Sequence, residues 1–404
     1  MIAVIKKSCA RGEIVAPPSK SMAHRHIICA AFSDGESLVE NVDFSQDILA
    51  TLDCIKALGA TVQKSDTSVL IKGIDYKTAP LCGDFYCRES GSTMRFFMGI
   101  AMCLGIKGRF FGSETLRNRP FGIYEDLCRE NGMTFERNED HILVEGRLNA
   151  GTYKIPGNVS SQFITGLLFA LPLLDSDSTI ELIPPVESRS YLDLTFKAMS
   201  DAGVTLKWAD DNTISVEGEQ KYIGRKIAVE GDFSNSAFLD AFNTIGGSVK
   251  TLGLSDDSLQ GDRIYREYFK KLQAETPTID ISNCPDLGPV LFCVAAANNG
   301  ALFTGTRRLK MKESDRGAVM CEELKKLSVE TFMEDNSIRI GKYDGSYPKE
   351  DICGHNDHRI VMSFAFLLSL SGGRILEAQA VNKSYPGFFS DIKNLGIEVD
   401  LEDE

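Results

Sequence analysis

Residues 17–32 read PPSKSMAHRHIICAAF and introduce the pattern that decides the fold. Ser19 or Ser21 can cap the first turn of a helix, because a side-chain oxygen accepts a hydrogen bond from a free backbone N–H there. The apolar run that follows continues the helix until the turn residues at 34–35 end it. We therefore predict a helix with a polar front end over residues 22–32.

The front end of this helix also carries positive charge. Ser21 and Arg25 lie four residues apart and share a helix face, with Lys20 beside them. A helix N-terminus already favours anions, because its free N–H groups and its dipole point outward. The stretch is therefore either an anion site or a solvated helix start with ordinary surface cations.

The same pattern occurs six times in the chain, at intervals of roughly 50 to 70 residues. A polar front end leads into an apolar helix, a short β-like stretch follows, and then an amphipathic helix that ends near a turn residue. In several copies a period-two hairpin closes the unit, which predicts a βαβαββ repeat. The front ends are residues 19–21, 89–93, 160–162, 232–236, 283–286 and 356–359. The amphipathic helices are predicted at 46–58, 121–131, 191–202, 261–272, 315–327 and 387–395.

The repeats predict an α/β fold of two lobes, each with three βαβαββ units. Helices that are apolar nearly all round must be buried, so we expect buried helices and outer sheets, an inside-out α/β barrel. We place the N-terminal lobe at residues 12–228. The C-terminal lobe takes residues 1–11 and 229–404, because the strand expected at 3–6 precedes the first copy. Two crossings between the lobes would suit a hinge.

Composition restricts the partners and the compartment. The 404 residues carry a formal net charge of −13, so we expect no nucleic-acid partner, since phosphate backbones require a basic face. The longest apolar runs, 163–174 and 360–370, fall short of the about 20 residues that cross a bilayer, so we expect no membrane association. Eleven scattered cysteines and the lack of a signal core in residues 1–11 predict reduced thiols and a cytoplasmic location.

Cations gather at equivalent points of the repeats in spite of the acidic balance. So many cations near helix N-termini imply one or two ligands with phosphate and carboxylate groups. Each residue taken alone is also compatible with a solvated surface. The cations are Lys20, Arg25, Arg95, Arg119, Lys312, Arg316, Arg359 and Lys383, and the acids among them are Asp47, Asp286 and Glu313.

Two short motifs have the residue types of a catalytic centre. Residues 312–316 read KESDR, in which Lys312 and Arg316 would share a helix face and Glu313 could move protons if burial raised its pKa. An exposed, salt-bridged helix start is the alternative. Residues 355–359 read HNDHR; two histidines suit a metal, but no third ligand completes the set and Arg359 would repel a cation, so no metal is expected.

These motifs together resemble the 5-enolpyruvylshikimate-3-phosphate (EPSP) synthase family of the shikimate pathway. The resemblance covers essentially the whole chain, and it implies two lobes of three βαβαββ units. It departs from the best-known bacterial pattern at Glu89 and Arg308, so Glu89 is not counted among the ligands and Arg308 is expected to form a local salt bridge instead. The motifs, in the family's order, are PPSKSMAHR, ESGSTMR, RNRP, VSSQF, CPD, KESDR, NDHR and NKSYPGFF.

The resemblance implies two sets of binding residues, with shikimate 3-phosphate mainly on the N-terminal lobe. The positions that match shikimate 3-phosphate ligands are Lys20, Ser21, Arg25, Ser160, Ser161, Gln162, Ser188, Tyr191, Asp286 and Lys312. The positions that match phosphoenolpyruvate ligands are Lys20, Gly91, Arg95, Arg119, Gln162, Arg316, His358, Arg359 and Lys383.

The resemblance also implies the chemistry, in which the enolpyruvyl group moves to the shikimate 5-hydroxyl by addition and elimination through a tetrahedral ketal. We expect Asp286 to act as base toward the hydroxyl and Glu313 as acid and base at the methyl carbon, with Lys20 assisting. No metal or organic cofactor is expected, and the protein is expected to be a monomer.

Two other functions remain open on the sequence alone. The sister enolpyruvyl transferase that acts on UDP-N-acetylglucosamine shares the fold, but it usually has Lys-Asn where this chain has Lys20-Ser21, and its reactive loop cysteine has no clear counterpart here. The other is a non-catalytic sensor of an anionic metabolite.

Overall fold

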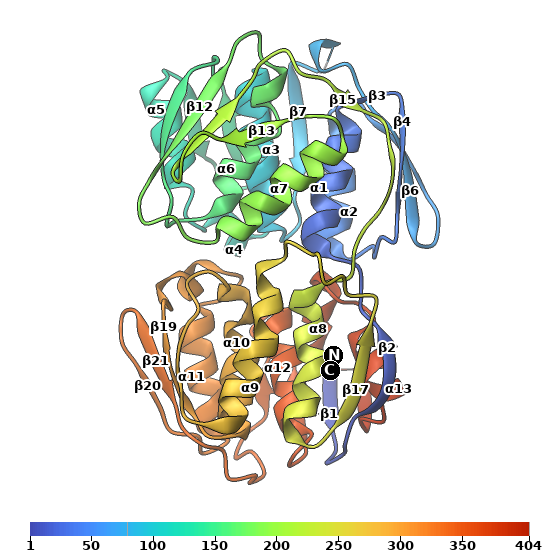
Figure 1. Cartoon of the computed structure of the whole chain (residues 1–404), viewed down its shortest axis with the longest axis vertical. Helices are drawn as coiled ribbons and strands as arrows, with labels where there is room; N and C mark the ends of the chain where they lie inside the picture. Colours follow the sequence, from blue (N-terminus) through green and yellow to red (C-terminus); the bar gives the residue numbers. More distant parts are fainter. Residues whose placement is uncertain (79, 404) are drawn as a thin grey trace. The chain divides into compact units, whose positions relative to one another are not determined.

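The computed structural model describes residues 1–78 and 80–403 of the chain, which has a mixed α/β fold. It forms two compact units (Figure 1). The middle unit comprises Lys20–Glu230, and the terminal unit comprises Met1–Ser19 with Gly231–Glu404.

Sheets in the middle unit repeat one topology. In the order β7-β8-β10-β9 the first two strands are parallel and the last two form an antiparallel hairpin, and β11-β12-β14-β13 is arranged alike. In β16-β4-β6-β5 the first position is taken by β16 from the end of the unit. The strands are β3 (Ser33–Asp34), β4 (Glu36–Glu40), β5 (Thr61–Lys64), β6 (Ser68–Lys72), β7 (Cys82–Tyr86), β8 (Lys107–Phe111), β9 (Thr134–Arg137), β10 (His141–Glu145), β11 (Thr152–Pro156), β12 (Ser178–Ile183), β13 (Leu206–Trp208), β14 (Thr213–Val216), β15 (Tyr222–Ile223) and β16 (Lys226–Ala228).

The helices of the middle unit are buried on the sides that face one another. Helices α3 and α6 pack closely because Gly99 and Gly166 lie at their contact: a Cβ on Gly99 would stand 2.5 Å from the backbone of Gly166. The helices are α1 (Lys20–Ala31), α2 (Gln46–Ala57), α3 (Gly91–Leu104), α4 (Glu114–Arg117), α5 (Gly122–Glu130), α6 (Ser161–Leu168) and α7 (Arg189–Asp201), with 3-10 turns η1 (Tyr76–Thr78) and η2 (Leu171–Leu173).

The terminal unit is closed by the first strand of the chain. Strand β1 lies between β23 and β24 and completes the sheet β22-β23-β1-β24, and β18-β19-β21-β20 repeats the topology above. The strands are β1 (Ile2–Ile5), β2 (Arg11–Val15), β17 (Ser248–Leu252), β18 (Thr278–Asp280), β19 (Ala301–Thr304), β20 (Thr331–Met333), β21 (Ser337–Ile340), β22 (Ile352–Cys353), β23 (Gly373–Leu376) and β24 (Val399–Glu402).

Helices α10 and α12 form the centre of the terminal unit and are buried on all sides (Figure 1). The helices are α8 (Phe233–Asp240), α9 (Tyr265–Ala274), α10 (Gly288–Ala297), α11 (Arg316–Lys326), α12 (His358–Leu368) and α13 (Phe388–Asn394). The 3-10 turns are η3 (Ala241–Ile245), η4 (Gly261–Ile264), η5 (Pro285–Leu287), η6 (Arg307–Met311) and η7 (Ala378–Lys383).

One predicted boundary is wrong by eight residues. The prediction gave residues 12–19 to the N-terminal lobe, but β2 pairs in parallel with β17, so the chain leaves the terminal unit only after Ser19. The reason is that β2 forms a two-stranded sheet with β17, which follows α8 in the terminal unit. The predicted return near residue 229 agrees with the observed one at Glu230–Gly231 to within two residues.

No helix among the described residues is long and apolar enough to cross a membrane.

Candidate functional site

Lys20 is the first residue of α1, and its charge is balanced by the neighbouring helix. Its Nζ atom lies 2.8 Å from Oδ2 of Asp47 in the first turn of α2, and the two side chains are only 15% and 11% exposed. The largely buried pair fixes Lys20 at the front end of α1. A ligand anion that binds Lys20 therefore competes with Asp47.

Arg25 is held rigidly inside the middle unit. Its Nε donates to Thr195 Oγ1 at 2.9 Å, Nη1 to the Ser21 carbonyl at 2.7 Å and Nη2 to the Tyr191 carbonyl at 2.9 Å. Burial lowers the pKa of Arg25 to about 10, so the side chain remains a cation at neutral pH. The guanidinium is thus a buried charge of fixed orientation beside the front ends of α1 and α7.

Arg95 and Arg119 converge on Gly91, the first residue of α3. A Cβ at Gly91 would stand 2.5 Å from Nη1 of Arg119 and 3.0 Å from Nη1 of Arg95. Arg95 donates to Gln162 Oε1 at 2.7 Å, and Gln162 Nε2 donates to Ser92 Oγ at 2.8 Å. The front ends of α3 and α6 are therefore joined through an arginine and an amide.

The remaining predicted ligands of the middle unit lie at the front ends of α6 and α7. Ser160 caps α6, since its side chain accepts a hydrogen bond from the Gln162 N–H, and Ser161 is the first residue of that helix. Ser188 precedes α7 with φ of +57°, and Tyr191 lies in the first turn. The structure thus brings the predicted residues of this unit to helix starts.

Supporting residues in the middle unit were missed by sequence reasoning. Thr195, which accepts from Arg25, lies 2.9 Å from Thr165 Oγ1, so a buried pair of hydroxyls orients the guanidinium. Isolated threonines inside helices give no sequence signal, because only the packing of α1, α6 and α7 brings them together.

His24 is buried and starts a chain of buried hydroxyls. Its Nδ1 lies 2.7 Å from Thr51 Oγ1, which lies 2.8 Å from Thr93 Oγ1, and Thr93 donates to Ser90, the cap of α3. Burial, then Lys20 and Arg25, lowers the pKa of His24 well below 6.5. His24 is therefore a neutral packing residue, and its chain of hydrogen bonds fixes α3 against α1 and α2.

In the terminal unit, Asp286 is surrounded by three cations. Its carboxylate lies 3.0 Å from Lys312 Nζ, 2.9 Å from Arg316 Nη1 and 3.4 Å from Arg359 Nη2. Burial alone would raise the pKa of Asp286, but Lys312, Arg359 and Arg316 together hold it well below 3.8. Asp286 is therefore ionised at neutral pH, and it is a weak base as long as these cations face it.

Arg316 joins three carboxylates in one buried position. Its guanidinium contacts Asp286, Glu313 Oε2 at 2.5 Å and Asp357 Oδ2 at 2.8 Å, and its side chain is 1% exposed. Burial opposes its charge, but Asp357, Glu313 and Asp286 raise the pKa of Arg316 above 12.5. Asp357, which also caps α12, was not predicted as a site residue.

The predicted helical pairing of Lys312 with Arg316 is wrong. Helix α11 begins at Arg316, and Lys312 lies in the preceding turn, because Asp315 caps the helix by accepting from the Ala318 N–H at 3.1 Å. The two cations nevertheless meet, since both contact Asp286.

The remaining predicted residues of the terminal unit lie around the start of α12. His358 and Arg359 are its first two residues, and both are buried. Lys383, at the end of η7, donates from Nζ to the Asn356 carbonyl at 2.5 Å. Arg308, a predicted departure from the family, donates to the Ser282 carbonyl at 3.3 Å.

Asp262 was not predicted as a site residue, and its pKa is shifted in the opposite direction from that of Asp286. It is 3% exposed and accepts a hydrogen bond from Ser234. Burial, then the charge of Asp286, raises the pKa of Asp262 to about 6, although Arg359 opposes this. A carboxyl group that titrates near neutral pH therefore lies within electrostatic range of Asp286.

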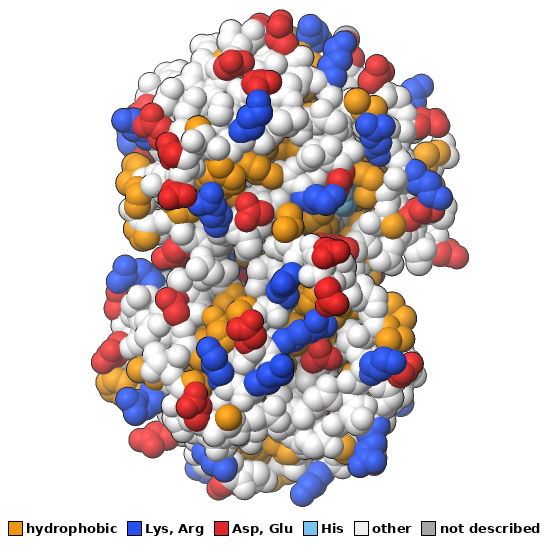
Figure 2. Space-filling view, viewed as in Figure 1, with side chains coloured by type: hydrophobic (Ala, Val, Ile, Leu, Met, Phe, Trp, Pro, Cys, Tyr) orange, Lys and Arg blue, Asp and Glu red, His pale blue; other side chains and the backbone are white. Residues whose placement is uncertain are grey.

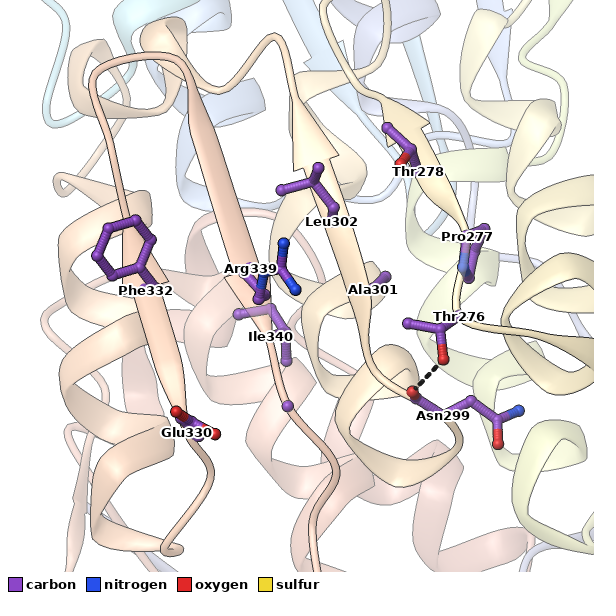
Figure 3. A pocket seen from close by; sticks show the side chains of 11 residues that line it. Thr276, Pro277, Thr278, Asn299, Ala301, Leu302, Glu330, Phe332, Arg339 and Ile340 are labelled. Atoms are coloured by element: carbon purple, nitrogen blue, oxygen red, sulfur yellow. Dashed lines mark hydrogen bonds between the residues drawn. The ribbon is translucent and has the colours of Figure 1, made fainter.

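A groove of about 460 Å³ in the terminal unit is separate from these residues (Figure 3). It runs over β18-β19-β21-β20, where the strand register aligns Thr278, Leu302, Arg339 and Phe332. None of the predicted site residues lines it.

On the face shown in Figure 2, acidic and basic side chains are interspersed. Within the described residues, no cluster of three or more His, Cys, Asp or Glu side chains is arranged to hold a metal ion.

The sequence of the whole chain matches one protein family. The model of the family described as EPSP synthase (3-phosphoshikimate 1-carboxyvinyltransferase) matches residues 5–392. The chain belongs to the EPSP synthase family. The resemblance drawn from the motifs is thereby confirmed.

Relatives and solved structures of EPSP synthases cover nearly the full length. The 3-phosphoshikimate 1-carboxyvinyltransferase of Clostridium kluyveri is 37% identical, over 96% of this chain and 96% of that protein. That of Clostridium perfringens strain 13 is 36% identical, over 97% and 98%. A structure of EPSP synthase from Acinetobacter baumannii superposes with a TM-score of 0.78 at 24% identity, over 99% of each chain, which shows the shared fold.

The raised pKa of Asp262 gives a test of the electrostatics by unfolding. The native pKa of about 6 exceeds the unfolded value of about 3.9, so the native state binds this proton more tightly. The contribution of the Asp262 proton to the free energy of unfolding is fully present below the unfolded pKa, and it is lost as pH rises through 6. Between pH 5 and pH 8, wild type should lose on the order of 1 kcal/mol relative to Asp262→Asn in urea titrations. The matched control is Asp256→Asn, whose carboxylate is 98% exposed; an equal pH response in both variants would contradict the assignment.

Proposed function

We propose that the chain transfers the enolpyruvyl group of phosphoenolpyruvate to the 5-hydroxyl of shikimate 3-phosphate and releases phosphate, a step toward chorismate and the aromatic amino acids. The observation that carries the proposal is the match of residues 5–392 to the EPSP synthase family. Lys20, Arg316 and Arg359 support the proposal because they lie in the first turns of helices, where phosphate and carboxylate groups bind favourably.

Shikimate 3-phosphate is proposed to bind the front ends of α1, α6 and α7. Arg25 supplies a charge of fixed orientation, and the hydroxyl groups of Ser21, Ser160 and Ser161 would add hydrogen-bond donors for a phosphate. Lys20 would exchange Asp47 for a substrate anion. The full proposed set is Lys20, Ser21, Arg25, Ser160, Ser161, Gln162, Ser188 and Tyr191, with Asp286 and Lys312 from the terminal unit.

Phosphoenolpyruvate is proposed to bind the guanidinium groups around Gly91 and those at the start of α12. Bidentate arginines suit both its phosphate and its carboxylate. The full proposed set is Lys20, Gly91, Arg95, Arg119, Gln162, Arg316, His358, Arg359 and Lys383.

Each unit is proposed to consist of three βαβαββ repeats, with buried helices and outer sheets, arranged as an inside-out α/β barrel. The two crossings of the chain would act as the hinge. We further propose that the protein works as a monomer in the cytoplasm, without nucleic-acid or membrane partners.

The proposed chemistry begins with addition. Glu313 donates a proton to C3 of phosphoenolpyruvate while Asp286 accepts the proton of the 5-hydroxyl, whose oxygen bonds to C2. Elimination follows: Glu313 removes a proton from the new methyl group, the C2–O bond to phosphate breaks, and the enol ether forms. Arriving substrate anions would draw Lys312 and Arg359 away from Asp286, which raises its basicity when it is needed. Lys20 assists, and fixed cations stabilise the charge on the leaving phosphate.

Phosphate release tests the proposed reaction. With both purified substrates present, phosphate should appear in step with the enol ether, and omission of either substrate should abolish it. UDP-N-acetylglucosamine in place of shikimate 3-phosphate distinguishes the sister transferase. Turnover with that nucleotide sugar, or no turnover with any pair, would overturn the proposal in favour of the transferase or the sensor respectively.

Gly91→Ala tests the position of phosphoenolpyruvate. The added methyl would displace the guanidinium of Arg119 and crowd that of Arg95. Loss of one charge-assisted contact, worth about 1.5–3 kcal/mol, should raise KM for phosphoenolpyruvate about 10- to 100-fold. KM for shikimate 3-phosphate should change far less.

The control is Gly122→Ala, at the first residue of α5, where an added Cβ meets nothing within 4 Å. Equal kinetic constants in the two variants would show that Gly91 is not beside this substrate.

Glu313→Gln tests the proton transfer at the methyl carbon. The change removes an ionisable group while it keeps the volume, so kcat should fall on the order of 10²–10⁴-fold with both KM values within a few-fold of wild type. Glu334→Gln, an exposed residue of the same unit, is the matched control. Near-normal turnover of Glu313→Gln would refute the role.

A further inference from the structure

The turn before α12 has an unusual backbone. His355 and Asn356 have φ of +48° and +49°, so two successive residues with side chains adopt the left-handed conformation. Such conformations are unfavourable for non-glycine residues and persist only where the surroundings hold them. The turn is therefore held in place by contacts outside itself.

A buried carboxylate on α11 provides these contacts. Glu323 is 0% exposed, and its carboxylate accepts a hydrogen bond from the Cys353 N–H at 2.9 Å. It also lies 2.9 Å from His355 Nε2 and 2.8 Å from Lys326 Nζ. Glu323 thus fixes both the backbone that enters the turn and the first left-handed side chain. On the other side of the turn, Glu377 accepts from the Asn356 N–H at 2.6 Å.

The turn in its observed shape contacts two cations, Lys383 at the end of η7 and Arg316 at the start of α11. The Asn356 carbonyl accepts from Lys383 Nζ at 2.5 Å. The Asp357 N–H donates to the Gly354 carbonyl at 2.9 Å, and the Asp357 carboxylate binds Arg316. A change of φ at either left-handed residue would move both the carbonyl and the carboxylate.

We propose that Glu323 is a positioning residue for phosphoenolpyruvate: it maintains the left-handed conformation of residues 355–356 and thereby the placement of Lys383 and Arg316. The proposal rests on the proposed function, since it assumes that these two cations bind that substrate. Glu323 itself contacts no substrate, and it acts through Cys353 and His355.

A volume-conserving substitution, Glu323→Gln, distinguishes the positioning role from a role in packing alone. A carboxylate is matched to three donors at this site: a backbone N–H, a histidine ring nitrogen and an ammonium group. In Glu323→Gln an amide NH₂ group replaces one of the two acceptor oxygens. It then faces one of these three donors, so one hydrogen bond to the turn or to Lys326 is lost. The volume is conserved, so packing is retained while the hold on the turn is lost.

Steady-state kinetics with both substrates test the proposal. Glu323→Gln should raise KM for phosphoenolpyruvate at least fivefold and leave KM for shikimate 3-phosphate within twofold. His355→Ala removes one of the three contacts and should shift the same KM in the same direction by a smaller factor. It also provides the readout if Glu323→Gln does not fold.

The matched control is Asp240→Asn in the same unit, whose carboxylate accepts from Thr251 Oγ1 at 2.6 Å far from the turn in sequence. This variant should lower the unfolding temperature without changing the ratio of the two KM values. Hydrogen exchange at the Cys353 and Asn356 amides should accelerate in Glu323→Gln and not in Asp240→Asn.

Equal changes in both KM values, or unchanged exchange at those amides, would overturn the positioning role. Lack of turnover in the wild-type protein would instead overturn the proposed function, so the two failures are distinguishable.

Discussion

The buried guanidinium of Arg316 is the constraint on which the charged centre of the terminal unit depends. One side chain, 1% exposed, contacts Asp286, Glu313 and Asp357. These residues come from η5, from the turn before α11 and from the cap of α12, so the arginine ties three segments together. A buried ion cluster of this kind is costly to disrupt on one side, because the charges left behind would lack partners.

In the middle unit, neutral acceptors orient Arg25 and Arg95 in place of carboxylates. Arg25 is oriented by Thr195 and by two backbone carbonyls, and Arg95 by the Gln162 amide. Neutral acceptors orient a guanidinium without cancelling its charge, which suits a site for a phosphate group. In the terminal unit the cations near Asp286 are paired with that carboxylate, as Lys20 is with Asp47 in the middle unit, so a substrate anion that binds them must exchange partners. This pairing accounts for the low pKa of Asp286 and for its dependence on what else the cations bind.

Much of the fold was predictable, because local hydrophobic periodicity and turn residues determine most of its helices and strands. The period-two hairpins predicted at the ends of several repeats are present as β5–β6, β9–β10, β13–β14 and β20–β21, and the amphipathic helices lie within a few residues of their predicted positions. The assignment of β2 was wrong, since pairing with β17 is a long-range contact with no local signature. The motifs likewise indicated which cations are candidate site residues. Asp262, Thr195 and Glu323 were not among the residues that the motifs indicated. Their roles depend on burial and on partners from distant segments, which a linear pattern does not contain.

In the proposed reaction, Glu313 adds a proton to the methylene carbon of phosphoenolpyruvate and later removes one from the resulting methyl group. Turnover in D₂O, followed by mass spectrometry of the enol ether, tests it most directly. In the proposed addition and elimination the methyl group of the intermediate carries a solvent hydrogen, so the product's methylene group should contain deuterium, and so should phosphoenolpyruvate recovered after reversal. Full turnover that yields a product without deuterium would contradict the account.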